Sequence, residues 1–128
     1  MRERLLPPAD RALAALVTDL WDRRLHEDTL LVVMSEFGRT PRINKDAGRD
    51  HWPDVQSMLL AGAGISGGSI HGATDRHAAF VATDPVTPPD QGQTILHLLG
   101  VPHDLELRDP QGRAVSASRG EVLRNLMA

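Results

Sequence analysis

Cysteine and tyrosine are absent from the 128-residue sequence, and aromatic residues make up only 3% of it. The lack of cysteine excludes disulfides, thiolate metal ligands and cysteine nucleophiles. No apolar run approaches the ~18 residues of a transmembrane helix. The N-terminus lacks the apolar core and cleavage site of a secretory signal peptide, so a cytoplasmic location is the default expectation.

The charge balance is slightly acidic, because 14 basic and 17 acidic residues give a net charge of −3. No basic excess is available to bind nucleic acid or an anionic membrane surface, and we expect neither as a partner. Apolar residues at 41% and charged residues at 24% are typical of a globular domain. The length predicts a single domain over residues 1–128.

The apolar pattern predicts an α/β protein. A first helix is expected after Pro7-Pro8, with Asp10 as its N-cap. Its apolar stripe has the spacing of a helix that faces a core, with members Leu13, Leu16, Val17, Leu20, Trp21 and Leu25. The run Leu30–Met34 follows and does not alternate, which is typical of a parallel strand buried on both faces.

Further elements are expected downstream of this run. Val55–Ala61 is a second candidate strand, and Ser69–His71 and Ala78–Ala82 are shorter candidates. The pattern therefore predicts a mostly parallel sheet with flanking helices.

The last third of the chain carries clear local signals. Thr87–Asp90 reads T-P-P-D, which predicts a helix start with a capping box. Gly100 is placed to end that helix in the left-handed conformation. Asp109–Gly112 fits a type I turn, and Glu121–Met127 is expected to form a short terminal helix.

A polar segment of nineteen residues, Ser35–Pro53, directly follows the first predicted strand. Long polar loops in compact domains are usually functional or disordered, and ligands of open parallel sheets bind at the carboxyl ends of strands. Glu36 lies at such an end, and Asp50 and His51 come just before the second strand. Carboxylate and imidazole groups suit zinc, manganese or a similar divalent ion.

Other roles for these residues remain open on sequence alone. Glu36 is also compatible with a helix cap or a surface ion pair, His51 with packing in the loop, and Asp50 with an ion pair to a nearby arginine. Arg39 and Arg42 border the segment and suit bidentate binding of a phosphate or sulfate ester. Their pairing with a neighbouring aspartate is an equal alternative.

The glycine-rich stretch Gly62–Gly67 matches G-x-G-x-x-G after a strand, which suggests dinucleotide binding. That function requires a helix to begin in the motif, so that its amides hold the pyrophosphate. Gly68–Gly72 is a poor helix, so a connection between strands is the better interpretation.

Two motifs resemble a known family. Ser35–Asn44 reads S-E-F-G-R-T-P-R-I-N and Gly48–Pro53 reads G-R-D-H-W-P. Both are similar to hallmark segments of the bacterial DUF1501 family, and the similarity extends over roughly residues 8–115. The family is in turn similar in fold to the alkaline phosphatase and sulfatase superfamily.

The resemblance implies a fold and a metal site. The fold would be the C-terminal part of an alkaline-phosphatase-like α/β sandwich, and the activity a metal-dependent hydrolysis of phosphate or sulfate esters. Glu36 and His51 would ligate a divalent metal, Zn or Mn, and Asp50 would be a further ligand or would orient His51. Phe37 departs from the pattern, because many superfamily members have a metal-binding histidine there.

The resemblance also implies that upstream metal ligands and a nucleophile are missing from residues 1–128, so no catalytic residue is assigned. We expect no efficient catalysis by the chain alone. Its expected partners are a missing N-terminal half or a second copy that pairs with an open sheet edge at Leu30–Met34. Members of the family are often exported. The alternative is a non-catalytic structural or binding module that retains the fold.

Overall fold

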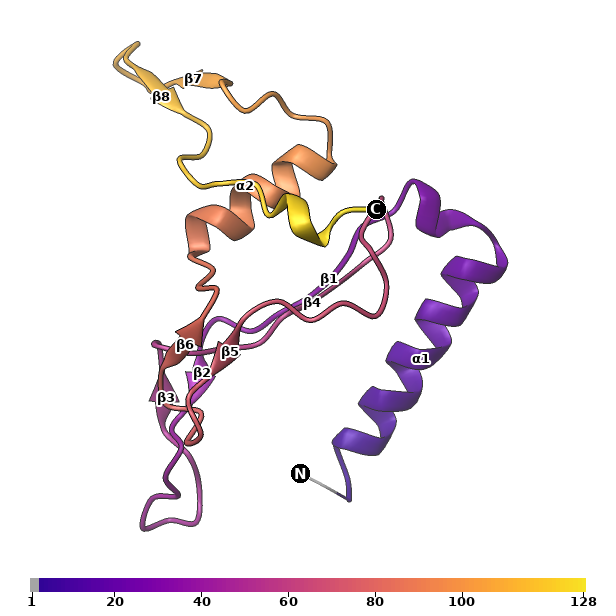
Figure 1. The fold of residues 1–128 in the computed structure, drawn as a ribbon, viewed down its shortest axis with the longest axis vertical. Coiled ribbons are helices and arrows are strands. Elements are labelled where there is room, and N and C mark those ends of the chain that lie inside the picture. The colour runs from indigo at the N-terminus through magenta and orange to yellow at the C-terminus, as the bar shows by residue number, and fades with distance from the viewer. Residues whose placement is uncertain (1–2) are drawn as a thin grey trace.

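The computed structural model describes residues 3–128, and its first element is helix α1 (Leu6–Asp22; Figure 1). Pro7 and Pro8 lie in its first turn, where a missing amide hydrogen costs nothing. The predicted N-cap was wrong, because Asp10 lies inside the helix and no side chain caps it. A 3-10 turn, η1 (Leu25–Glu27), connects α1 to the first strand.

One long antiparallel hairpin occupies the middle of the molecule (Figure 1). At its base β1 (Leu31–Val33) pairs with β4 (Leu59–Ala61). Towards its tip β2 (Gly38–Arg39) pairs with β3 (His51–Trp52). The polar segment between the two predicted strands is therefore the far end of a hairpin.

The mixture of helices and strands agrees with the predicted α/β class, but the mostly parallel sheet does not appear. Every sheet among residues 3–128 has two strands, and each pair is antiparallel. The predicted burial on both faces was also wrong, because Leu31 and Val32 are only half-buried and Val33 is exposed. A non-alternating apolar run does not specify the direction of a strand. Here the intervening segment folds back on itself, so the direction is that of a hairpin.

Two smaller hairpins follow. β5 (Ala73–Thr74) pairs with β6 (Val81–Thr83), and β7 (Glu106–Arg108) pairs with β8 (Ala114–Ser116). The strand predicted at Ser69–His71 was wrong, and the one predicted at Ala78–Ala82 is displaced towards its C-terminal end.

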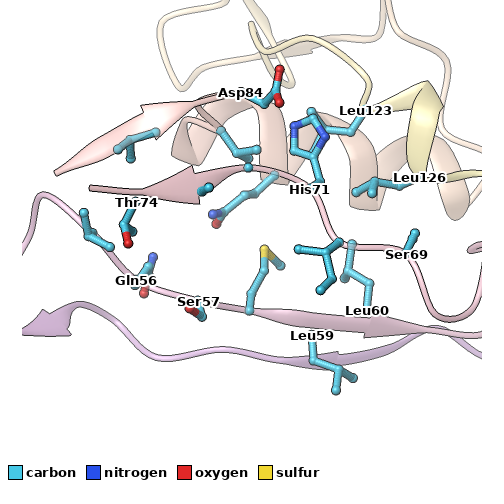
Figure 2. Close-up of a pocket in the computed structure, with 18 of the residues that line it drawn as sticks. Gln56, Ser57, Leu59, Leu60, Ser69, His71, Thr74, Asp84, Leu123 and Leu126 are labelled. Carbon is cyan, nitrogen blue, oxygen red and sulfur yellow. The ribbon is translucent and has the colours of Figure 1, made fainter. Parts of the chain in front are cut away.

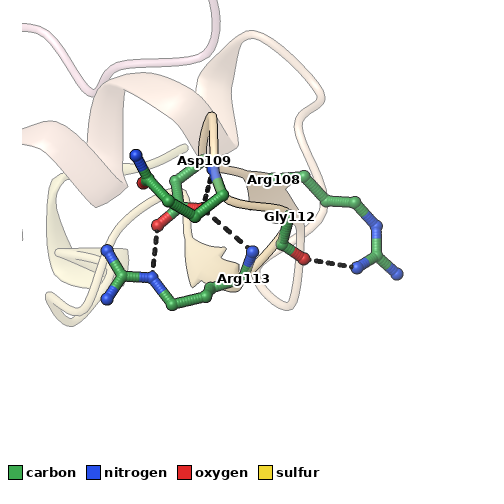
Figure 3. A network of polar contacts seen from close by, with 5 residues as sticks. Arg108, Asp109, Gly112 and Arg113 are labelled. Carbon is green, nitrogen blue, oxygen red and sulfur yellow. Dashed lines mark hydrogen bonds and ion pairs between the residues drawn. The ribbon is translucent and has the colours of Figure 1, made fainter.

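The turn of the β7–β8 hairpin confirms its prediction (Figure 3). The amide of Gly112 donates to the carbonyl of Asp109 at 2.8 Å. The Asp109 carboxylate accepts from the amides of Gln111 and Arg113, each at 2.9 Å, and from the Arg113 guanidinium at 2.6 Å. The Arg113 amide and side chain are the foremost causes that hold the Asp109 pKa below its ordinary value.

Helix α2 (Pro88–Leu98) confirms the predicted capping box, because the Thr87 hydroxyl and the Asp90 carboxylate each accept from the other's backbone amide. Gly100 has a φ of +76° after its end, as predicted. The C-terminal segment lies against this helix. Glu121 donates its amide to Asp90 at 2.8 Å and Leu123 donates its amide to Thr94 at 3.0 Å.

The predicted terminal helix is only a 3-10 turn, η2 (Arg124–Leu126). The residues before it are not helical, because the amides of Glu121 and Leu123 bond to side chains of α2 instead of to carbonyls of their own segment. The chain end then returns to the glycine-rich stretch, where Ser66 donates to the carbonyl of Leu126 and Ala128 to that of Gly64.

Acid is expected to loosen the contact between α2 and the C-terminal segment. The Thr87 hydroxyl, followed by the amides of Glu121 and Thr87, holds the Asp90 pKa below its ordinary value. The stabilisation by this carboxylate is therefore complete above its unfolded pKa of about 3.9 and is lost as pH falls through the lower folded pKa. When the pH is lowered from neutral to acid, the denaturation midpoint should fall more for the native chain than for Asp90→Asn. Equal pH dependence of the two would contradict this role.

The described chain has almost no core. Leu20 is its one buried apolar side chain, and the two side chains with the least exposure are polar, Gln93 and Thr94. The accessible surface is 9809 Å², whereas a compact monomer of 14.0 kDa exposes about 6,700 Å². Within residues 3–128, no helix is long and apolar enough to span a bilayer. The elements thus expose apolar surface that a compact domain would bury.

Candidate functional site

The predicted site residues lie at the tip of the long hairpin. Arg39 on β2 is directly opposite His51 on β3. Directly opposite residues point to the same face of a sheet, so both side chains share one face of the hairpin. Phe37 joins them, because its ring lies 3.8 Å from the His51 ring between centroids and 5.7 Å from the Arg39 guanidinium carbon. This face, defined by Phe37, Arg39 and His51, is called the tip face below.

The stacking leaves His51 able to bind a ligand. The two rings are inclined by 32°, so Phe37 covers one face of the imidazole. The lone pairs of imidazole nitrogens lie in the plane of the ring, away from that contact. His51 is exposed, and so is Glu36, which lies between β1 and β2.

Asp50 is held by Asn44 and by no arginine among the described residues. The Asn44 amide donates to the Asp50 carboxylate at 2.8 Å, and its side-chain oxygen accepts from the amides of Asp46 and Gly48. The backbone of Asp50 also donates to the Thr40 hydroxyl at 3.1 Å. Asn44 therefore orders the whole loop between β2 and β3 and fixes the residue that precedes His51.

Arg49 is a second organiser of the loop. Its guanidinium donates to the carbonyls of Thr40 and Pro41, at 2.7 and 2.6 Å. Arg39 donates to the Arg49 carbonyl at 3.3 Å. Neither Arg39 nor Arg42 forms an ion pair within residues 3–128. No carboxylate of the described residues therefore neutralises either guanidinium group.

The opposite face of the tip anchors it to the β5–β6 hairpin. Trp52 donates its indole N–H to the Ala79 carbonyl at 2.7 Å, and its ring meets Phe80 edge-on at 5.8 Å. Tryptophan combines a large apolar area with one donor, and both are used here. This anchor leaves the tip face exposed.

Sequence analysis named Arg39, Asp50 and His51 as candidates but did not identify the roles of Asn44, Arg49 and Trp52. An asparagine that bonds the amide two residues ahead is a local turn signal, and it was available for Asn44. No short sequence pattern indicates that Arg49 binds carbonyls eight and nine residues before it, or that Trp52 reaches Ala79, which is 27 residues ahead. Across the described part of the chain, no three His, Asp or Glu side chains are grouped closely enough to hold a metal ion.

A family model described as "Protein of unknown function (DUF1501)" matches residues 1–127. The chain belongs to the DUF1501 family. No curated protein and no solved structure matches it. The match covers both the hairpin tip and the segments that anchor it, so the similarity seen in the two motifs is confirmed at the level of the family.

The glycine-rich stretch of this DUF1501 chain is a connection between strands. Gly62 and Gly64 have φ values of +81° and +85°, and no helix begins between Gly62 and Thr87. A side chain at Gly62 would stand 2.3 Å from the Thr29 carbonyl oxygen. The glycine therefore serves close packing of the backbone, and the helix needed for dinucleotide binding is not there.

A cavity of the DUF1501 chain lies between the long hairpin, β5 and the C-terminal segment (Figure 2). Its volume is about 720 Å³, and its lining includes Ser57, Leu60 and Leu123. His71 also lines it, with Nδ1 hydrogen bonded to the Asn125 amide at 2.7 Å. The cavity lies between two-stranded sheets, and apolar side chains form most of its wall.

Proposed function

We propose that this chain supplies part of the metal site of an alkaline-phosphatase-like enzyme that hydrolyses phosphate or sulfate esters. Glu36 and His51 would be metal ligands, and Asp50 would be a further ligand or would orient His51. Arg39 and Arg42 would bind the oxygens of the ester. The proposal depends on the resemblance carried by the E-F-G-R-T-P and G-R-D-H-W-P motifs.

The observation that supports it best is the shared tip face. Arg39 lies directly across from His51 on one exposed side of the hairpin. A cation beside an imidazole favours binding of an oxyanion next to a metal ligand. The donor types also fit zinc or manganese, with carboxylate oxygen from Glu36 and imidazole nitrogen from His51.

The residues of this chain fit only part of a metal site. Structural and catalytic zinc sites take three or four protein ligands, and the described residues group fewer. The remaining ligands would come from polypeptide outside residues 3–128. When bound, the metal would polarise the ester and lower the pKa of a nucleophile.

The roles of this chain's own residues follow from the contacts at the tip. Asn44 and Thr40 hold Asp50, which keeps His51 in register with Arg39. Arg49 ties down the carbonyls on the outgoing side of the loop. The loop is thus ordered before any ligand arrives, which lowers the entropic cost of binding.

If the ligands of this chain hold zinc without the rest of the site, excess zinc should stabilise the chain and His51→Ala should abolish that effect. A ligand at a hundred times its dissociation constant adds about 2.7 kcal/mol, which raises the melting temperature of a domain near this size by roughly 10 °C. Thermal melts in chelator and in zinc measure the shift, with His103→Ala as a control because His103 is exposed and distant in sequence from the motifs. An equal rise in the melting temperature of His51→Ala in zinc would contradict the role of His51 as a metal ligand.

A second candidate is a non-catalytic module that retains the fold. It is favoured by the Phe37 ring, which covers one face of His51 where a ligating histidine would be expected. In that case, His51→Ala would change only local packing. Hydrolysis of an aryl phosphate and an aryl sulfate by the longest protein that contains this chain separates the two. Metal-dependent turnover lost in His51→Ala supports the enzyme, and no turnover of either ester supports the module.

A further inference from the structure

The cavity between the long hairpin, β5 and the C-terminal segment has the size of a small-molecule site (Figure 2). Its volume of about 720 Å³ falls within the range of about 300–1,000 Å³ that is typical of ligand pockets. Leu60 from the hairpin and Leu123 and Leu126 from the C-terminal segment contribute apolar side chains to its wall. Voids left by ordinary packing are seldom much larger than a water molecule, so this cavity has room for a ligand.

Hydrogen bonds between distant segments hold the wall of the cavity together. The amide of Ser66, at the end of the glycine-rich stretch, donates to the carbonyl of Leu126 at 2.8 Å. The amide of Leu123 donates to the Thr94 hydroxyl on α2 at 3.0 Å. The C-terminal segment is thus fixed to two other parts of the chain where it borders the cavity. A cavity formed in advance lowers the entropic cost of binding a ligand.

His71 places a hydrogen-bond donor in the wall. The side-chain nitrogen of Asn125 donates to Nδ1 of His71 at 2.7 Å, so Nδ1 is an acceptor. In the neutral imidazole the other ring nitrogen then carries the hydrogen. Nε2 of His71 forms no hydrogen bond within residues 3–128, and its N–H is available to an oxygen atom of a ligand.

The charged residues of the wall favour a ligand without net charge. Asp54 and Asp84 line the cavity, whereas no lysine or arginine among the described residues does. A charge that is buried against apolar side chains needs a partner of opposite sign, and this wall offers none to an anion. Both carboxylates are exposed, so water solvates them and they offer no buried partner to a cation.

We propose that this cavity binds an uncharged apolar molecule that carries a carbonyl oxygen, which accepts a hydrogen bond from Nε2 of His71. The apolar body of the ligand contacts Leu60, Leu123 and Leu126. Two of these leucines belong to the C-terminal segment, so the ligand also holds that segment in place. The inference does not rest on the proposed function, because no residue of the tip face lines the cavity.

Fluorescence titration of the full chain with Prodan, an uncharged naphthalene that carries a ketone, tests the site. The native chain should bind one Prodan molecule, and it should bind the anionic naphthalene sulfonate ANS at least tenfold more weakly. Ser57→Trp places a large ring in the cavity and should weaken Prodan binding at least tenfold. Ala114→Trp is the matched control, because it adds the same ring at an exposed position of β8 outside the cavity, and should bind as the native chain does.

Three results of this titration would overturn the proposal. They are the absence of saturable Prodan binding by the native chain, a preference for ANS, and unchanged Prodan binding in Ser57→Trp. The last would show that the dye binds exposed apolar side chains elsewhere. Circular dichroism checks that the variants fold, and Ala73→Trp on β5 fills the cavity from another side if Ser57→Trp does not fold.

The role of His71 is tested by His71→Phe, which keeps a ring of similar size and removes the donor. Its affinity for Prodan should fall about fivefold, as expected for the loss of one hydrogen bond. Its affinity for 2-(dimethylamino)naphthalene, which lacks the ketone, should not change. His103→Phe, at an exposed position outside the cavity, is the control. Equal weakening of both dyes in His71→Phe would contradict the hydrogen bond to the ligand.

Discussion

Gly38→Ala is expected to disrupt the hairpin tip and with it the candidate site. A Cβ at this position would lie 1.7 Å from the Val55 carbonyl oxygen and 3.1 Å from that of Trp52. Both obstacles are backbone atoms, so the two strands must separate. We expect a loss of at least about 3 kcal/mol for the part of the fold that contains the tip.

The measurement is amide hydrogen exchange at the tip, together with tryptophan fluorescence. The amide of Thr40 donates to the Asp50 carbonyl, and this protection should vanish. Trp52 should lose its contact with the β5–β6 hairpin, which should change its fluorescence. The measurement uses a Trp21→Phe background, so that Trp52 is the one tryptophan that emits. Gly67→Ala is the control, because no heavy atom lies within 4 Å of its added Cβ. Unchanged exchange at Thr40 in Gly38→Ala would contradict the close approach of the strands.

Gly120→Ala is expected to release the C-terminal segment from α2. Gly120 is buried, and its Cβ would lie 2.0 Å from the Pro89 carbonyl oxygen. The hydrogen bonds from Glu121 to Asp90 and from Leu123 to Thr94 would then break. The expected loss is about 3 kcal/mol, because a close-packed backbone contact and two hydrogen bonds are lost together.

Gly92→Ala, within α2 itself, is the matched control and should change stability in the opposite direction. No heavy atom lies within 4 Å of its added Cβ, and alanine is a better helix former than glycine by about 0.5–1 kcal/mol. The denaturation midpoint of Gly120→Ala should therefore lie below that of the native chain, and the midpoint of Gly92→Ala should lie above it. Hydrogen exchange at the Glu121 and Leu123 amides shows whether the C-terminal segment has left α2. Retained protection of these amides in Gly120→Ala would contradict the close contact of Gly120 with Pro89.

The local features of the fold were predicted well. The capping box of Thr87 and Asp90, the left-handed Gly100 and the turn that begins at Asp109 are all present. Each depends on side chains and backbone within four or five residues of one another, so its chemistry can be read from adjacent letters. The α1 helix was also predicted, although its first turn starts earlier than the expected cap at Asp10.

The places of the candidate site residues along the chain were expected, but their surroundings were not. Glu36 follows β1 as expected, but His51 lies in a short strand that was not predicted, and Asp50 directly precedes that strand. Their surroundings depend on the hairpin that folds Ser35–Pro53 back on itself. The pairing of Arg39 with His51 and the contact of Trp52 with Ala79 join residues from distant parts of the sequence. No local pattern specifies such partners.

By itself the sequence determined the family, the helices α1 and α2, the capping box and C-terminal glycine of α2, the turn at Asp109, and the polar character of the candidate site. Only the tertiary structure decided the antiparallel direction of β1 and β4, the shared face of Arg39 and His51, and the exposure of α1. The physical reason is the range of the interactions. Propensity, capping and turn geometry act within a few residues, whereas strand direction and burial depend on which distant segments are present to pair and to pack.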